Sequence, residues 1–334
     1  MVNTLQREDT DSEEVSNVYI KGADIVINCC LVHLSVLVGV FGNTVTLIIL
    51  SRSAVRDTTS IILMSMAACD TWFLVNLSAR KCDCLMARFD PVLVDIYNAY
   101  TVSYVRRPGR WAAFVAVSHT TLISCERLLS VFFPLKVSRM VNRRTILTAL
   151  LGIYLSWPVC VVPFAAFNYR IEWSFNNFYN RTMPAIHETQ WFTDNRLVLD
   201  IINDLVITMV TFSFAALVAA NSCATACRLS QVAKQRSMMV SKKMEGSRID
   251  IKASRMLLVV CCVFNICNFP GFVICIYFYL DSSLRPPDRL HKLLSDVEGL
   301  LLAVNAASNF FVYTLMSARF YNAVVALIGC GREI

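Results

Sequence analysis

Long uncharged runs alternate with short charged segments along the chain. Five runs contain no Asp, Glu, Lys or Arg, and they cover residues 25–50, 145–167, 205–227, 256–280 and 299–318. A helix needs about 20 mostly apolar residues to cross the hydrocarbon core of a bilayer. Each run reaches that length, so the pattern predicts five membrane-spanning helices.

Two further apolar stretches contain or border charged residues. Residues 58–79 contain a single charged side chain, Asp70. Residues 111–125 are uncharged and directly follow the arginine-rich segment 106–110. With these two stretches the number of predicted spans rises to seven. We therefore expect an all-α membrane protein folded as a seven-transmembrane helix bundle.

The predicted spans divide the chain into three parts. Residues 1–23 form a polar N-terminal tail, residues 24–318 the seven-transmembrane domain, and residues 319–334 a final segment. In that segment Phe320 and Val324 recur at helical spacing. This spacing predicts a short amphipathic eighth helix that lies along the membrane surface.

Composition supports the membrane assignment and orients the chain. Hydrophobic residues make up 56% of the chain and charged residues 16%, whereas about 25% of a soluble protein is charged. The segments that share a side with the C-terminus hold 17 of the 31 Lys and Arg residues. Basic residues gather on the cytoplasmic side. We expect a multi-pass plasma-membrane protein with its N-terminus outside and its C-terminus inside. The net charge of +7 reflects this bias. We therefore expect the lipid bilayer as a partner and no nucleic acid.

Five of the predicted spans carry short polar motifs. The motifs are Gly42-Asn43, SMAACD ending at Asp70, ERL from Glu126, FNICNFP from Phe264 to Pro270, and NFFVY from Asn309 to Tyr313. They resemble the motifs of rhodopsin-like (class A) G-protein-coupled receptors, and the resemblance covers residues 24–330. The local amino-acid sequence of residues 109–137 is most similar to that of divergent molluscan receptors for neuropeptides or chemosensory ligands.

The resemblance implies a receptor that converts the binding of an extracellular ligand into activation of a heterotrimeric G protein. Such a protein performs no bond chemistry, so we expect no enzyme activity. The four histidines, His33, His119, His187 and His291, are scattered and indicate no metal site. An alternative is a transporter or channel that uses Asp70 as its ion site. Many transporters contain two related halves, and we see no internal repeat here.

The resemblance also assigns an activation switch near the inner ends of spans three, six and seven. Its residues are Glu126, Arg127, Asp250, Phe264, Pro270, Asn309 and Tyr313. Arg127 is always charged, and we expect it to bond Glu126 and Asp250 at rest, which keeps helix six in place. Pro270 is expected to kink that helix. The alternative is that Arg127 only anchors span three at the membrane edge.

Asp70 is a carboxylate at the predicted middle of the membrane, where an ionisable group is costly and usually functional. Its candidate partners are Asn43, Asn305 and Asn309, and in the family this network often holds sodium. Ala116 and Ala306 stand where the family usually offers hydroxyl groups, which weakens the case for sodium. The alternative is a static polar network that joins helices.

The candidate ligand pocket lies at the outer end of spans three and six. Arg106 and Arg110 are four residues apart, on one helical face, with Trp111 beside them and Asn268 on span six. Gly109 occupies the place where amine receptors carry an Asp. The pattern favours a peptide or an anionic small molecule as ligand. The alternative is that the arginines pair with acidic residues of the outer loops.

Several features predict covalent chemistry. Asn180 begins an Asn-Arg-Thr sequon in an outer loop, and Cys330 is a candidate for palmitoylation. The family's usual outer disulfide is missing, because Val102 replaces its span-three cysteine and residues 168–195 contain no cysteine. A replacement can join Cys29 or Cys30 to Cys82 or Cys84, and the sequence leaves these pairings open.

Overall fold

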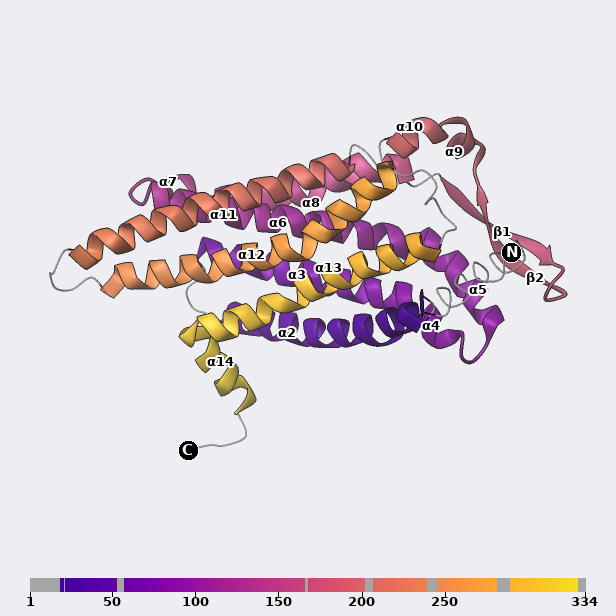
Figure 1. Cartoon of the computed structure of the whole chain (residues 1–334), viewed down its shortest axis with the longest axis horizontal. Coiled ribbons are helices and arrows are strands. Elements are labelled where there is room, and N and C mark those ends of the chain that lie inside the picture. Colours follow the sequence, from indigo (N-terminus) through magenta and orange to yellow (C-terminus); the bar gives the residue numbers. More distant parts are fainter. Residues whose placement is uncertain are drawn as a thin grey trace, which may run out of the picture.

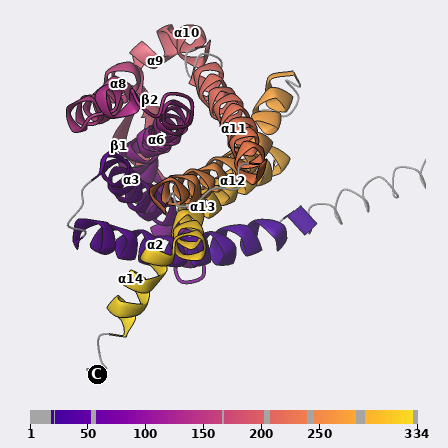
Figure 2. The same ribbon diagram turned by 90° about the vertical axis from the view of Figure 1, so that its left-hand side faces the viewer.

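The computed structural model describes residues 19–20, 22–52, 57–165, 168–201, 207–238, 245–280 and 289–329. Within these ranges, seven long helical rods lie side by side along one axis (Figure 1). Figure 2 looks along that axis and shows the rods grouped around one another rather than stacked in layers. The predicted seven-helix bundle is confirmed.

The rods follow the predicted spans closely. In chain order they are η1 (Val26–Leu31) continued by α2 (Val32–Arg52), α3 (Thr58–Lys81), α6 (Arg106–Phe132), α8 (Arg143–Ala165), α11 (Ile207–Met238), α12 (Glu245–Leu280) and α13 (Arg289–Met316). Five helices in the described ranges are long and apolar enough to cross a membrane. Helices suit this environment because they satisfy every backbone hydrogen bond internally.

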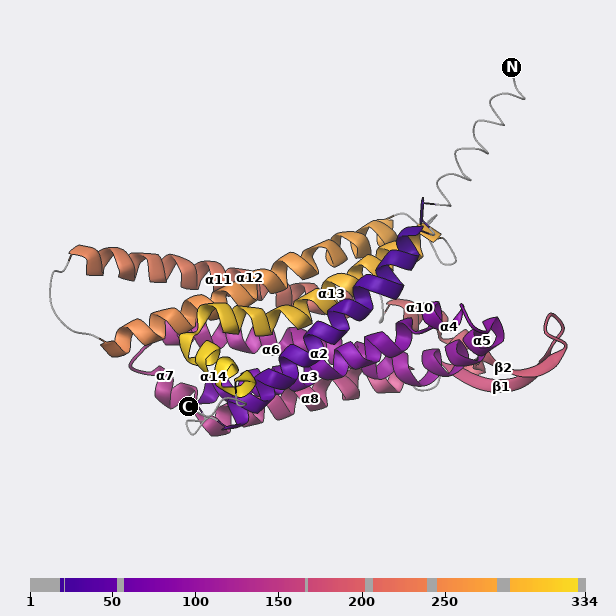
Figure 3. The same cartoon turned by 90° about the horizontal axis from the view of Figure 1, so that it is seen from below.

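Shorter elements occupy the two ends of the bundle. One end, which we call the hairpin end, carries α4 (Asp83–Met86), α5 (Pro91–Tyr100), η2 (Thr101–Val105), β1 (Tyr169–Asn176), β2 (Arg181–Glu188), α9 (Gln190–Asp194) and α10 (Arg196–Asp200). The opposite end, which we call the Arg127 end, carries α7 (Val137–Met140) and α14 (Ala318–Ile328). Figure 3 shows α14 turning away from the axis of α13. The predicted eighth helix is therefore present.

A β-hairpin was not expected from the sequence. Strands β1 and β2 pair antiparallel from Tyr169 opposite Glu188 to Asn176 opposite Arg181. Asn180 closes the turn with a φ of 50°, a left-handed conformation that Asn tolerates better than most residues. The hairpin projects beyond the helix ends (Figures 1 and 3).

The core lies along the seams between helices. Near the Arg127 end, the buried cluster includes Ile62, Met66, Ile123, Leu257 and Tyr313. Near the hairpin end it includes Val36, Phe73, Leu74, Val115 and Ala303. Large apolar side chains such as Leu37, Phe41, Trp72 and Leu155 face outward. This arrangement suits a protein whose exterior contacts lipid.

Two glycines let the first and last rods approach closely. A Cβ atom added at Gly42 would lie 2.7 Å from Cβ of Phe310 on α13. One added at Gly39 would lie 2.5 Å from Cδ1 of Leu74 and 3.0 Å from Cβ of Ala307. Small residues serve this purpose in membrane helices, where van der Waals packing drives association.

Helix α12 continues through Pro270. Proline lacks an N–H and removes one backbone hydrogen bond of the helix. Asn268, just before it, donates from its amide to the Phe264 carbonyl at 2.8 Å. Figure 1 shows α12 changing direction near its middle, as the sequence predicts for a proline kink.

Candidate functional site

Glu126 and Arg127 lie at the foot of α6 as a nearly buried ion pair. Nη2 of Arg127 is 2.8 Å from Oε1 of Glu126, and the side chains of Arg127 and Glu126 are 12% and 4% exposed. A third residue, Thr59 of α3, completes the arrangement. Its hydroxyl donates to Oε1 of Glu126 at 2.7 Å and accepts from Nη2 of Arg127 at 2.6 Å. Hydrogen bonds to charged groups are the stronger kind, so this trio holds the guanidinium against α3.

The start of α3 explains why Thr59 faces α6. Asp57 caps the helix by accepting a hydrogen bond from the Ser60 backbone N–H at 2.9 Å. Such a cap fixes the first turn. Thr58 also points toward Glu126, at a longer 3.4 Å. No role for Thr59 was predicted from the sequence. The signal that could have indicated it is the pair of threonines, Thr58 and Thr59, directly after the capping residue Asp57.

The other proposed partner of Arg127 is Asp250. Its backbone belongs to α12, but its side chain lies outside the described residues. A bond between Arg127 and Asp250 therefore stays a prediction. The side chains of Arg106 and Arg110, and all of Cys330, also lie outside the described part of the chain.

Asp70 is buried at the centre of the bundle, with 2% of its surface exposed. Asn309 of α13 donates to its Oδ2 at 2.9 Å. Asn43 instead donates to the backbone carbonyl of Ala306 at 3.1 Å, so its amide joins α2 to α13. Asn305 lines the same cavity as Asp70. The three asparagines thus have three different roles.

That cavity has a volume of about 20 Å³. Its polar lining is Asp70, Asn268 and Asn305, and its apolar lining includes Phe73, Phe264 and Leu302. A water molecule fits such a space. A hard cation binds several oxygen atoms, whereas Ala113, Ala116 and Ala306 present methyl groups here. These residues do not fit a built sodium site.

Two further switch residues are also buried: Phe264 lines this cavity, and Tyr313 lies between the cavity and the Arg127 end. Phe264 is fully buried on the Arg127 side of Pro270, among Val117, Ala215 and Val218. Tyr313 is buried and packs its ring 5.8 Å from that of Phe320, so it links α13 to α14. Movement of either helix must rearrange these contacts, because close-packed interiors transmit displacement.

Trp111 and Asn268 were both predicted to line the ligand pocket. Asn268 lines the central cavity, and the contact of either residue with a ligand stays a prediction. Trp111 packs its ring 5.9 Å from that of Tyr154 on α8 and is not among the residues that line the cavity. Position 111 therefore faces α8, because it is rotated around α6 from Ala113 and Ala116.

A polar trio between α3, α6 and α8 was also not predicted from the sequence. Nε2 of His119 lies 2.8 Å from the Ser65 hydroxyl, which is 3.0 Å from the Tyr154 hydroxyl. Nδ1 of His119 lies 2.7 Å from the Val115 carbonyl. A carbonyl only accepts, so Nδ1 carries the hydrogen and donates it. Every hydrogen-bonding atom of the imidazole ring is satisfied, which indicates a structural role.

The fold and these sites define a class A seven-helix receptor. The chain matches the family model of the seven-transmembrane receptors of the rhodopsin family over residues 42–313, and it belongs to that family. No curated protein sequence matches the chain significantly. Its membership of the rhodopsin family makes the protein a multi-pass membrane receptor that signals through heterotrimeric G proteins, and not an enzyme. This finding replaces the transporter or channel alternative.

Proposed function

We propose that this receptor responds to an extracellular peptide of the neuropeptide or chemosensory kind, which binds at the hairpin end. We further propose that the Arg127 end binds the G protein at the inner face of the plasma membrane. The contrast between a very small central cavity and several strongly exposed aromatic side chains at the hairpin end supports this proposal best.

The orientation is proposed from the charges. The loops at the Arg127 end hold most of the basic residues, and basic loops stay cytoplasmic. The hairpin end, with the sequon at Asn180, then faces outside. Asn180 is exposed in the hairpin turn, where a glycan meets no steric obstacle.

The cavity is too small for a drug-sized ligand. Small-molecule pockets occupy about 300–1,000 Å³, whereas the central cavity measures about 20 Å³. At the hairpin end, by contrast, Trp173 is 64% exposed, Phe178 86% and Phe89 88%. Aromatic residues are enriched at protein and peptide interfaces, and we propose that these side chains contact the ligand. Arg106 and Arg110 lie at the start of α6, nearest this surface, and are proposed to receive an acidic group of the ligand.

The G-protein switch is proposed to be the Arg127 latch. At rest, Glu126 and Thr59 hold the guanidinium, and Asp250 is proposed to add a bond from α12. Ligand binding favours a state in which the inner half of α12 swings outward about Pro270. Arg127 then loses the bond to Asp250 and becomes available to the G protein.

The test is basal nucleotide exchange on G proteins in membranes that contain equal amounts of surface receptor. Asp250→Ala is expected to raise exchange above wild type, and adding Arg127→Ala is expected to abolish the increase. If no variant drives exchange on any G-protein class, the latch is wrong.

Ligand docking has its own test. Peptide responses of wild type are compared with those of Trp173→Ala and Phe178→Ala, and with Ser174→Ala as a control on the opposite face of β1. The proposal predicts that the aromatic variants need higher peptide concentrations while Ser174→Ala responds normally. Equal responses from all four receptors would exclude this docking surface.

A further inference from the structure

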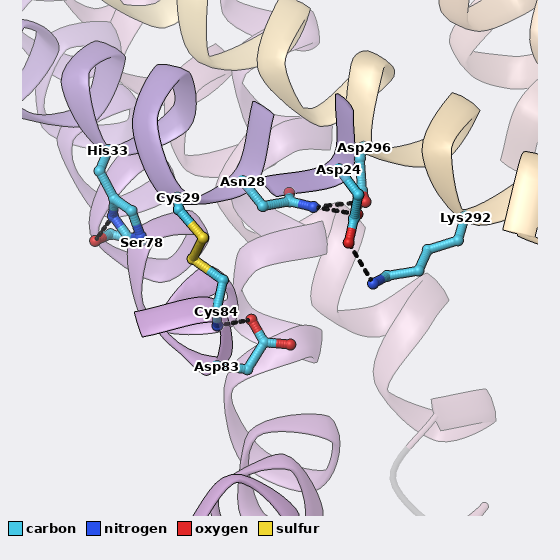
Figure 4. The surroundings of a disulfide bond; sticks show 9 residues. All are labelled: Asp24, Asn28, Cys29, His33, Ser78, Asp83, Cys84, Lys292 and Asp296. Carbon is cyan, nitrogen blue, oxygen red and sulfur yellow. Dashed lines mark hydrogen bonds and ion pairs between the residues drawn. A yellow bond between two sulfur atoms is a disulfide. The ribbon is translucent and has the colours of Figure 1, made fainter. Parts of the chain in front are cut away.

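At the hairpin end, helix one, α3, α4 and α13 meet in one cross-linked cluster, part of which is drawn in Figure 4. We call this cluster the outer clasp. Its members are Asp24, Asn28 and Cys29 from helix one, Lys81 from α3, Cys84 from α4, and Lys292 and Asp296 from α13.

The covalent arm of the clasp is a disulfide between Cys29 of η1 and Cys84 of α4, with Cα atoms 5.8 Å apart. It settles which of the open cysteine pairings forms. The usual family disulfide ties span three to the second outer loop, and this chain lacks both of those cysteines. The covalent tie of the hairpin end therefore runs through helix one.

The segment after Cys84 is also tied to the bundle. Tyr97 of α5 donates from its phenol to the Ala79 carbonyl of α3. Burial raises the pKa of the Tyr97 phenol above its ordinary value, so it remains a donor at neutral pH. The disulfide thus links helix one to a segment that α3 already holds.

The ionic arm of the clasp joins helix one, which contains η1 and α2, to α3 and α13. The Asn28 amide donates to Oδ2 of Asp296 and to Oδ1 of Asp24, each at 2.7 Å. Lys81 pairs with the other oxygen of Asp296, whose side chain is 5% exposed. At the surface, Lys292 lies 3.1 Å from Asp24. Asp296 is therefore the point where three helices meet.

The two arms begin at consecutive residues of one π-helical segment, η1. π-helical turns are rare and are frequently found at functional sites. Here the turn lets Asn28 face α13 while Cys29 faces α4 (Figure 4). Any displacement of η1 after loss of the disulfide moves the amide that holds Asp296. A buried ion pair depends on its surrounding hydrogen bonds, so the contact between Asp296 and Lys81 weakens as well.

We propose that the outer clasp is a redox-sensitive conformational switch, in which reduction of Cys29–Cys84 frees the outer end of α13. The reductant is a dithiol at the cell surface. It supplies two electrons and two protons, the S–S bond breaks into two thiols, and the dithiol closes into its own disulfide. Both cysteines are partly exposed, and they face the outside in the orientation proposed above.

Hydrogen–deuterium exchange of the purified full-length receptor tests this switch. The segment to follow is 289–296, with and without dithiothreitol. Reduction is expected to speed its deuterium uptake. The double variant Cys29→Ser, Cys84→Ser is expected to exchange fast without reductant and to show no further response. Cys30→Ser and Cys82→Ser remove neighbouring free thiols and are expected to behave like wild type.

Three results would overturn the proposal. The first is unchanged uptake in 289–296 after maleimide labelling has shown Cys29 and Cys84 to be reduced. The second is a double variant that responds to dithiothreitol as wild type does. The third is Asp296→Asn, with the disulfide intact, leaving uptake unchanged, since the ionic arm would then not hold α13. No ligand or G protein enters the measurement, so its outcome does not depend on whether the proposed receptor function is correct.

Discussion

Thr59 bridges the two charges of the pair at the foot of α6, donating to Glu126 at 2.7 Å and accepting from Arg127 at 2.6 Å. The hydroxyl thus holds the guanidinium with no charge of its own. Because Thr59 belongs to α3, the bond fastens Arg127 to a helix other than α12. Together with the proposed bond from Asp250 of α12, this bond would hold Arg127 at rest from two separate helices.

Thr59→Val keeps the shape of the side chain and removes the hydroxyl. A hydrogen bond to a charged group contributes about 1.5–3 kcal/mol, so we expect basal nucleotide exchange to rise by about tenfold. Thr58→Val is the matched control, because Thr58 lies at a longer 3.4 Å from Glu126, and it is expected to change exchange little. Equal effects of the two variants would contradict a specific role for Thr59.

Asn309→Ala removes the hydrogen bond from α13 to the buried carboxylate of Asp70. A buried polar group without a partner costs about 1–3 kcal/mol, so we expect a lower melting temperature in detergent. The comparison is Asn305→Ala, which alters the cavity that Asp70 lines without removing a hydrogen bond to Asp70. If both variants melt alike, the bond between Asn309 and Asp70 does not stabilise the bundle.

His119→Leu is expected to destabilise the receptor by about 1–3 kcal/mol, because it removes two buried hydrogen bonds of the imidazole, one with the Ser65 hydroxyl and one with the Val115 carbonyl. Tyr154→Phe removes only one hydroxyl from the same trio and is expected to cost less, about 1 kcal/mol. Thermal unfolding of the purified variants measures both effects. If Tyr154→Phe lowered the stability more than His119→Leu, the imidazole of His119 would not be the main contact of the trio.

Gly42→Ala places a methyl group 2.7 Å from Cβ of Phe310, which forces α2 away from α13. Overpacking typically costs about 1–3 kcal/mol, so surface expression and thermal stability are expected to fall. The control is Gly152→Ala on α8, where nothing lies within 4 Å of the added Cβ. Alanine is the better helix former, so this change is expected to be neutral or stabilising.

Asn180→Gln tests the proposed orientation. Glycans are added only on the outer side, so the variant is expected to migrate faster on a denaturing gel, as wild type does after glycosidase treatment. Asn76→Gln is the control. Asn76 also begins a sequon but is buried within α3, so no shift is expected. A wild-type receptor that glycosidase leaves unchanged would mean that Asn180 carries no glycan.

The sequence by itself determined the seven helices and their approximate limits. Uncharged runs of spanning length have few alternatives in a membrane, since an unpaired backbone group costs several kcal/mol there. The family followed from short motifs such as Gly42-Asn43 and Asn309 to Tyr313. The pairing of Glu126 with Arg127 was also accessible, because the two residues are adjacent in the chain.

Only the tertiary structure decided which groups meet across helices. The motifs of the sequence offered Asn43, Asn305 and Asn309 as candidate partners of Asp70, yet only Asn309 among the described residues donates to it. Likewise, four cysteines near one end allowed several pairings, and the packed structure joins Cys29 to Cys84. Rotation of a helix by a fraction of a turn changes such partners without altering the hydrophobic pattern. For the same reason, Thr59 and the outer clasp could be found only from the packed bundle.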